Sequence, residues 1–224
     1  MGKSLFLCNT VYQVLVAVWL KCSLFNDKNT DIIISNHMNG FQDVAQNIRS
    51  TGAFEKVYTV ESKEYVKGIN ESTKKQVTQC FKLAHADKEI SKFMVLDDIY
   101  DEVFVANFDF FADLLFNALK VKNKNLKFSI FEDGISTYCR SFENGYKRCF
   151  LARFIKHFVG AYVMYGNLSE CYVFNPDLMD WKPCEKITKV PKIDDKNIAF
   201  IEKINTIFGY DQLEDTYKEK YIFY

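Results

Sequence analysis

The sequence predicts an α/β protein built on a doubly wound parallel sheet. Short apolar runs of strand length alternate with longer segments of helical periodicity, a pattern typical of strands joined by crossover helices. The strand-like runs are apolar throughout, which indicates a parallel sheet covered by helices on both faces. The 224 residues are enough for one sizeable domain plus a fragment of another. We therefore expect a Rossmann-like unit of about five strands.

The expected elements follow in order along the chain. Strands are expected at residues 3–8, 30–36, 55–61, 101–107 and 127–134, with a sixth at 170–175. Helices are expected at residues 9–25, 39–54, about 70–93, 108–122, 146–160 and 196–209. Asn9 or Thr10 is placed to cap the first helix, and Gly52 lies near the end of the second. Pro183 and Pro191 bracket a loop before the last helix.

Composition excludes several classes of protein. Lys and Arg number 29, as do Asp and Glu, so no net charge draws the chain to nucleic acid. The seven cysteines are irregularly spaced, without CxxC or zinc-ligand spacing, which predicts reduced thiols and no metal site. Residues 5–20 are too interrupted by polar side chains for a signal peptide or a membrane span. We expect a cytoplasmic protein, and peripheral association with the inner face of the membrane stays compatible with this composition.

Polar residues follow four of the expected strands. In open parallel sheets, ligands bind beyond the carboxyl ends of the strands. The four polar ends are Cys8-Asn9-Thr10, Ser35-Asn36-His37, Ala106-Asn107 and Glu132-Asp133-Gly134. A purely structural sheet needs polar turns at the same places, so a binding site and ordinary turns are both open at this point.

Glu132 and Asp133 are adjacent carboxylates at the end of an apolar run, directly before Gly134. If the chain turns at the glycine, one carboxylate projects into the crevice while backbone N–H groups or a basic partner hold the other. Their pKa values then separate, and one can serve as a general base. The alternative is that Asp-Gly is only turn chemistry. The hydroxyls of Ser136 and Thr137 follow closely.

The stretch "CNTVYQ" lies between the first strand and its helix. It lacks the glycines of a dinucleotide-binding loop, but its polar side chains suit hydrogen bonds to a sugar, with helix capping as the alternative. His37 is a candidate pocket residue, His85 is expected mid-helix at the surface, and His157 is expected in a packed interior or interface. No GxSxG, P-loop or HExxH motif is present in the sequence.

Three segments together resemble the N-terminal half of bacterial sialyltransferases: "SLFLCNTVYQVLVAVWL", "VFVANFDFFADLLFNAL" and "IFEDGISTYCR". The similarity runs in order over most of residues 4–140 and more loosely to the end. It points to the lipooligosaccharide sialyltransferases of glycosyltransferase family 52 and to the capsular polysialyltransferases. The resemblance implies a GT-B fold, in which two Rossmann-like domains face each other across a cleft. It also implies metal-independent, inverting transfer from CMP-sialic acid to a cell-surface glycan, without a cofactor.

The resemblance assigns the general base to the acidic-Gly motif, at Asp133 or Glu132, with Asp133 preferred. The "CNTVYQ" loop would line the acceptor side. With the other polar strand ends, the expected substrate-binding residues are Asn9, Thr10, Tyr12, Gln13, Asn36, His37, Asn107, Gly134, Ser136 and Thr137. An exposed aromatic side chain among Tyr12, Phe108, Phe110 and Tyr138 would stack on a sugar.

One departure from the family pattern concerns the donor. The family binds CMP through a His-Pro motif and a later serine motif in its second domain, and this sequence has no His-Pro dipeptide. We therefore expect residues 1–215 to form the acceptor-binding domain and 216–224 to begin a truncated donor-binding domain. The isolated chain would then be inactive. The alternatives are a GT-B enzyme that uses another nucleotide sugar and a non-catalytic glycan-binding domain.

Overall fold

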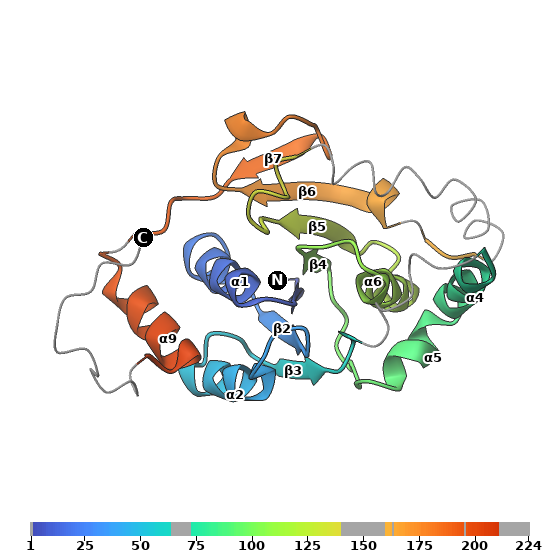
Figure 1. The fold of residues 1–224 in the computed structure, drawn as a ribbon, viewed down its shortest axis with the longest axis horizontal. Coiled ribbons are helices and arrows are strands. Elements are labelled where there is room, and N and C mark those ends of the chain that lie inside the picture. Colours follow the sequence, from blue (N-terminus) through green and yellow to red (C-terminus); the bar gives the residue numbers. More distant parts are fainter. Residues whose placement is uncertain (1, 64–72, 140–159, 163, 195, 211–224) are drawn as a thin grey trace.

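The computed structural model describes residues 2–63, 73–139, 160–162, 164–194 and 196–210. In this part of the chain, seven parallel strands form one sheet in the order β3-β2-β1-β4-β5-β6-β7. Helices cover both faces, with α1 and α9 on one side and α4, α5 and α6 on the other (Figure 1). The α/β, Rossmann-like fold predicted from the sequence is confirmed, since the strand order 3-2-1-4-5-6 is that of doubly wound nucleotide-binding sheets.

Apart from β7 and the helices at 73–91, the bounds of the described elements lie close to the expected ranges. The strands are β1 Ser4–Cys8, β2 Thr30–Ser35, β3 Val57–Val60, β4 Glu102–Val105, β5 Lys127–Phe131, β6 Leu168–Val173 and β7 Lys186–Lys189. The helices are α1 Val11–Ser23, α2 Phe41–Thr51, α4 Thr73–Ala84, α5 Ala86–Ser91, α6 Phe110–Lys122 and α9 Ile198–Phe208, with short 3-10 turns at Tyr165–Asn167 and Pro176–Leu178. No helix among the described residues combines the length and the apolar character that crossing a bilayer requires.

The sheet separates two apolar cores. Along β1, Leu5 and Leu7 face the core beneath α4, α5 and α6, whereas Phe6 and Cys8 face the core beneath α1, α2 and α9. Because both faces are covered, every residue of β1 is buried. This explains why the central strands read as continuous apolar runs rather than as an alternating pattern.

The expected loop between Pro183 and Pro191 is wrong, because strand β7 lies there and extends the sheet to seven strands. This edge strand has no fully buried residue, and it begins and ends with lysine. Lysines are typical of edge strands because they discourage further pairing. A half-exposed strand of this kind lacks the apolar run that identifies a central strand.

The expected single helix at 70–93 is also wrong in part. Two helices, α4 and α5, occupy this range instead of one. His85 lies between them as the exposed N-cap residue of α5 rather than as a mid-helix residue. Its surface position is as predicted. Two expected segments fall outside the described residues. They are the helix at 146–160 with His157, except for its last residue, and the segment 216–224.

Candidate active site

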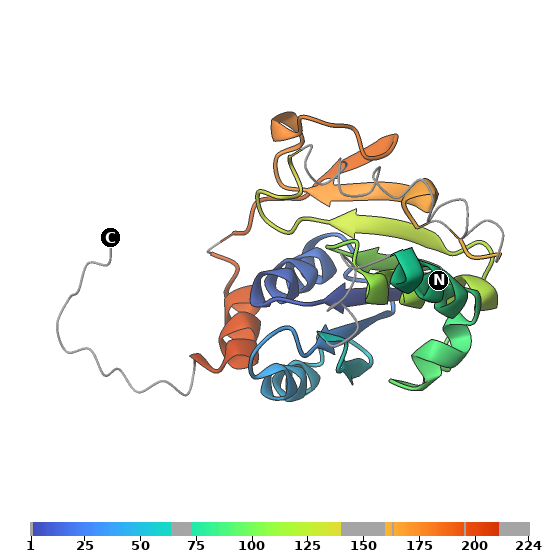
Figure 2. The same cartoon turned by 45° about the vertical axis from the view of Figure 1, so that its right-hand side comes forward.

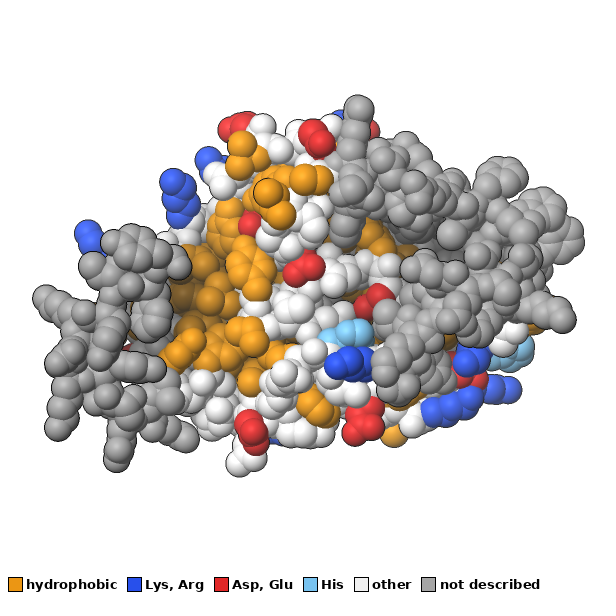
Figure 3. Space-filling view, in the orientation of Figure 1, with side chains coloured by type: hydrophobic (Ala, Val, Ile, Leu, Met, Phe, Trp, Pro, Cys, Tyr) orange, Lys and Arg blue, Asp and Glu red, His pale blue; other side chains and the backbone are white. Residues whose placement is uncertain are grey.

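The carboxyl ends of β1, β2, β4 and β5 meet at one edge of the sheet and bring most of the predicted site residues together. They differ in exposure: Asn9, Gln13, Glu132 and Thr137 are buried; Asn36, His37, Asn107, Asp133 and Gly134 are half-buried; Thr10, Tyr12 and Ser136 are exposed. On the face shown in Figure 3, acidic side chains lie near the middle, beside a broad area of hydrophobic side chains.

Glu132 is 6% exposed, and both of its carboxylate oxygens already accept hydrogen bonds. The hydroxyl of Tyr12 donates to Oε1 at 2.9 Å. The hydroxyl of Tyr138 and the backbone N–H of Phe174, the latter at 2.9 Å, donate to Oε2. Burial, together with the bond to Glu132, raises the pKa of both tyrosines above its usual value. Glu132 therefore anchors two tyrosines and the end of β6.

Asp133 is half-buried and is held by amides. Gln13 Nε2 donates to Oδ1 at 2.9 Å. The Asn107 amide directs its nitrogen to Oδ2, the orientation in which both ends of that amide find partners. Among the described residues, no Lys, Arg or His forms an ion pair with the negative charge of Asp133. Burial, reinforced by that charge, raises the pKa of the neighbouring Cys8 thiol.

The turn after β5 sets the direction of the two carboxylates. Gly134 has φ +68°, a left-handed conformation that residues with a Cβ rarely adopt. The Asp133 N–H donates to Thr137 Oγ1 at 2.7 Å, and the Thr137 N–H donates to the Gly134 carbonyl at 3.2 Å. The turn expected for the Asp-Gly pair is therefore present, and it separates a buried Glu132 from a half-buried Asp133.

Asn9 connects the strand ends. Its side-chain Oδ1 accepts from Ser35 Oγ at 2.6 Å, and its Nδ2 donates to Asp109 Oδ2 at 2.9 Å. Sequence reasoning missed Asp109, which is the N-cap of α6 and accepts from the Ala112 N–H at 2.7 Å. Its signal was an aspartate just before a helical run, two residues beyond the polar strand end at Asn107. Burial raises the pKa of Asp109, although hydrogen bonds from Ala112 and Asn9 oppose the shift.

Other predicted residues do not hydrogen-bond to the carboxylates of Glu132 or Asp133 through their side chains. Thr10 caps α1, with Oγ1 accepting from the Gln13 N–H at 3.2 Å. Asn36 Oδ1 accepts from the Lys63 N–H at 2.9 Å. Ser136 Oγ donates to the Asp133 carbonyl at 3.0 Å. His37 lies close enough to Asp109 to favour its ionised form, and His37 Nε2 is buried without a hydrogen-bond partner among the described residues.

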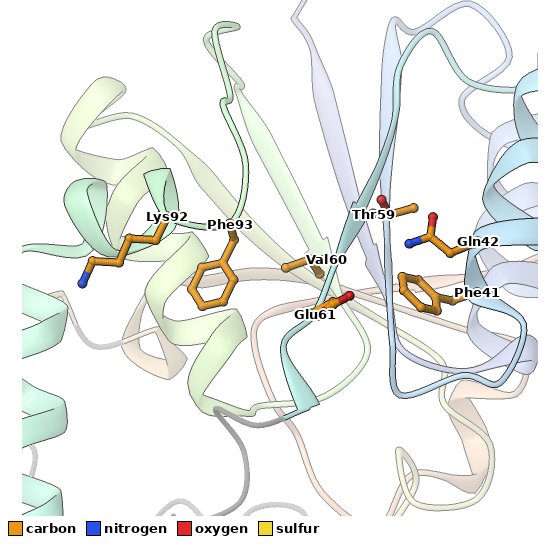
Figure 4. Close-up of a pocket in the computed structure, with 7 residues that line it drawn as sticks. All are labelled: Phe41, Gln42, Thr59, Val60, Glu61, Lys92 and Phe93. Carbon is orange, nitrogen blue, oxygen red and sulfur yellow. The ribbon is translucent and has the colours of Figure 1, made fainter.

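A separate hollow of about 400 Å³ lies beyond the carboxyl end of β3. Phe41 and Phe93 approach it from opposite sides, with Val60 and Glu61 between them (Figure 4). Gln42, Thr59 and Lys92 complete its lining. None of the residues predicted from the sequence lines this hollow.

Comparison with known families decides the class of the protein. The chain matches the model of the alpha-2,8-polysialyltransferase family over residues 4–223. It belongs to this family. It is therefore a glycosyltransferase of the sialyltransferase kind. Comparison with curated proteins found no match.

In this polysialyltransferase-family chain, the edge of the sheet carries an oriented carboxylate, a kind of group that can accept a proton. Asp133 is this carboxylate, and the nearby Tyr12 is 40% exposed. Among the described residues, no three His, Cys, Asp or Glu side chains are grouped as metal ligands. The same edge thus holds an oriented carboxylate and a partly exposed aromatic residue.

Proposed function

We propose that this chain supplies the acceptor side of an enzyme that transfers sialic acid from CMP-sialic acid to a glycan, with inversion at the anomeric carbon and without a metal. The observation that carries the proposal is the contrast between the two adjacent carboxylates. Glu132 is buried and accepts three hydrogen bonds, whereas Asp133 is half-buried and, among the described residues, its carboxylate faces the amides of Gln13 and Asn107. Asp133 is therefore the general base.

In the proposed step, the acceptor hydroxyl donates a hydrogen bond to the Asp133 carboxylate. Its proton moves to Asp133 as the oxygen forms a bond to the anomeric carbon of sialic acid. The bond from that carbon to the phosphate oxygen breaks, and CMP leaves with the electron pair. A sugar hydroxyl is a weak nucleophile near neutral pH, so an oriented base and a fixed acceptor are what the reaction requires.

The two tyrosines position the acceptor in this proposal. Glu132 fixes the hydroxyl ends of Tyr12 and Tyr138, so the rings are held at the edge with few alternative conformations. Aromatic faces pack against sugar rings at low entropic cost when they are already fixed. The exposed face of Tyr12, in the first turn of α1, is the surface that would contact the acceptor.

The donor nucleotide is assigned to a second domain, because the sequence lacks a His-Pro dipeptide. Residues 1–215 then bind the acceptor. We take the acceptor to be a lipooligosaccharide or a capsular glycan assembled at the inner face of the membrane. This arrangement predicts that the isolated chain neither binds CMP tightly nor transfers sialic acid.

The test is transfer by the full reading frame that carries this chain, with CMP-sialic acid as donor and an oligosialic acid or a lactoside as acceptor. Released CMP and the sialylated product are both measured. Asp133→Asn should lower kcat by about 10²- to 10⁴-fold, the usual contribution of a general base. The exposed Asp97→Asn, which removes the same charge elsewhere, should not change it.

Each competing function has its own outcome in this assay. Full activity of Asp133→Asn would reject the base assignment. Glycan binding without transfer to any acceptor would identify a binding domain. Transfer from another nucleotide sugar, but not from CMP-sialic acid, would show that the assigned donor is wrong.

A further inference from the structure

We propose that Asp109 is a positioning residue for the base: it acts through Asn9 and Gln13 and holds the Asp133 carboxylate in its reactive orientation. This inference rests on the proposed role of Asp133. It concerns a residue that the sequence motif does not contain, on a different strand end and helix from the base.

The first connection is between Asp109 and Asn9. Asp109 Oδ2 accepts from Asn9 Nδ2 at 2.9 Å, while Asn9 Oδ1 accepts from the Ser35 hydroxyl at 2.6 Å. If the Asn9 amide rotated, its oxygen would face the carboxylate of Asp109, with no proton between them. Asp109 therefore permits only one orientation of the Asn9 side chain and fixes the position of the loop between β1 and α1.

The second connection is between Asn9 and Gln13. The backbone N–H of Asn9 donates to Gln13 Oε1 at 2.6 Å. A backbone N–H can only donate, so the oxygen of the Gln13 amide must face it and the nitrogen must face the other way. That nitrogen donates to Asp133 Oδ1 at 2.9 Å. Gln13 is fully buried, so water does not offer its amide an alternative partner.

The charge on Asp109 is not explained by stability. Burial raises the pKa of Asp109, which means that the surroundings favour the neutral acid relative to an exposed aspartate. An asparagine would cap α6 about as well, since Asn and Asp are nearly equal at N-caps. A carboxylate at a position where an uncharged asparagine would cap the helix equally well, joined through Asn9 and Gln13 to the base, is what a positioning role requires.

The test is Asp109→Asn in the full reading frame, with the transfer assay described above. The new amide can accept either from Ala112 or from Asn9, and its nitrogen then faces the other donor. We expect kcat to fall about 10- to 100-fold, the scale of a misplacement of about 1 Å. The KM for the acceptor should stay within about twofold, because the surface offered by Tyr12 is unchanged. The melting temperature should stay within a few degrees, because the cap is kept.

A double variant that exchanges the side chains at positions 9 and 109, the swapped pair, makes the test more specific. In Asn9→Asp combined with Asp109→Asn, the amide at 109 donates to the carboxylate at 9, and the bond is restored with reversed polarity. Recovery of most of the lost kcat supports the proposal. Unchanged kcat in Asp109→Asn, a swapped pair no better than the single variant, or loss of activity in step with the melting temperature would each overturn it.

Asp133→Asn in the same series separates the two proposals. If Asp133→Asn abolishes transfer and Asp109→Asn does not lower it, only the positioning role fails. If Asp133→Asn retains activity, the base assignment fails and the positioning role fails with it.

Discussion

Two edges of the same sheet bury carboxylates in different ways. At the amino edge, Asp31 is 0% exposed and forms an ion pair with Lys3 at 3.0 Å. It also accepts from the Tyr100 hydroxyl at 2.6 Å. At the carboxyl edge, Glu132 is almost as deeply buried, yet its donors are two tyrosine hydroxyls and one backbone N–H. Figures 1 and 2 show the strands running between these two edges.

The two edges differ in the partners of their carboxylates, which are cations at the amino edge and neutral donors, among the described residues, at the carboxyl edge. At the amino edge, burial alone would lower the pKa of Lys3, but hydrogen bonds to Asp98, Asp31 and Glu55 hold it above the usual range. Lys3 therefore keeps its proton near neutral pH. At the carboxyl edge, the donors to Glu132 and Asp133 among the described residues are neutral. In the proposed function, such an oriented carboxylate accepts the proton of the acceptor hydroxyl.

The largest expected effect on folding is at the amino edge. Asp31→Ala should lower the free energy of unfolding by about 3 kcal/mol, because it leaves Lys3 without its fully buried partner. Urea denaturation measures this loss. Glu55→Ala, which removes a partner whose side chain is 47% exposed, should cost less than about 1 kcal/mol. Equal losses in the two variants would show that burial does not distinguish the ion pairs.

Gln13→Glu tests the carboxyl edge by placing a second carboxylate against Asp133. The like charge should raise the pKa of the base and lower kcat by about 100-fold near neutral pH. The acid limb of the pH–rate profile should move to higher pH, which distinguishes this cause from simple misfolding. Gln42→Glu, at an exposed position of α2, is the matched control and should leave the profile unchanged.

Tyr12→Phe should have a smaller effect on folding. It removes the donor to Glu132 Oε1 and leaves a buried oxygen without that hydrogen bond. Such a loss costs about 1 kcal/mol. Thermal and urea denaturation measure it against Tyr210→Phe, at an exposed tyrosine, where no change is expected. A loss that is equal in both variants would argue against the anchoring role of Glu132.

The smallest expected effect is on the pH dependence of stability. Burial, followed by the hydrogen bond to Asp31, raises the pKa of Tyr100 in the folded protein. As the pH rises past about 10, the unfolded chain loses this proton while the folded protein keeps it, so the free energy of unfolding falls. At pH 10.5 the contribution of Tyr100 to this fall is less than about 1 kcal/mol. Tyr100→Phe should flatten the fall in urea denaturation between pH 8 and 10.5, and an unchanged slope would contradict the assignment.

The central strands could be predicted because their burial is visible in their own residues. Strands β1 and β2 each contain an apolar run, and every residue of both is buried because the sheet is covered on both faces. Strand β7 could not be predicted in this way, because an edge strand is stabilised by its neighbour. Lys186 and Thr188 both reach Glu170 on β6, and that pairing is not visible in a short segment that begins and ends with lysine.

The acidic motif was visible in the sequence, but the difference between its two carboxylates was not. Glu132 and Asp133 are neighbours in the chain, and local propensity treats them almost alike. The two carboxylates differ because Glu132 contacts Tyr12 and Asp133 contacts Gln13. Each partner lies 120 residues earlier in the chain than the carboxylate it contacts. Asp109 was missed for the same reason, since its contact with Asn9 spans 100 residues.

By itself, the sequence determined the class of fold and the edge of the sheet at which polar groups gather. Alternating apolar runs and polar strand ends are local properties, and they follow from which residues must leave water. Only the tertiary structure decided which carboxylate is enclosed by tyrosines and which is held by amides. That decision depends on distant segments meeting at one edge, where a buried polar group must find its partner among whatever side chains the fold places there.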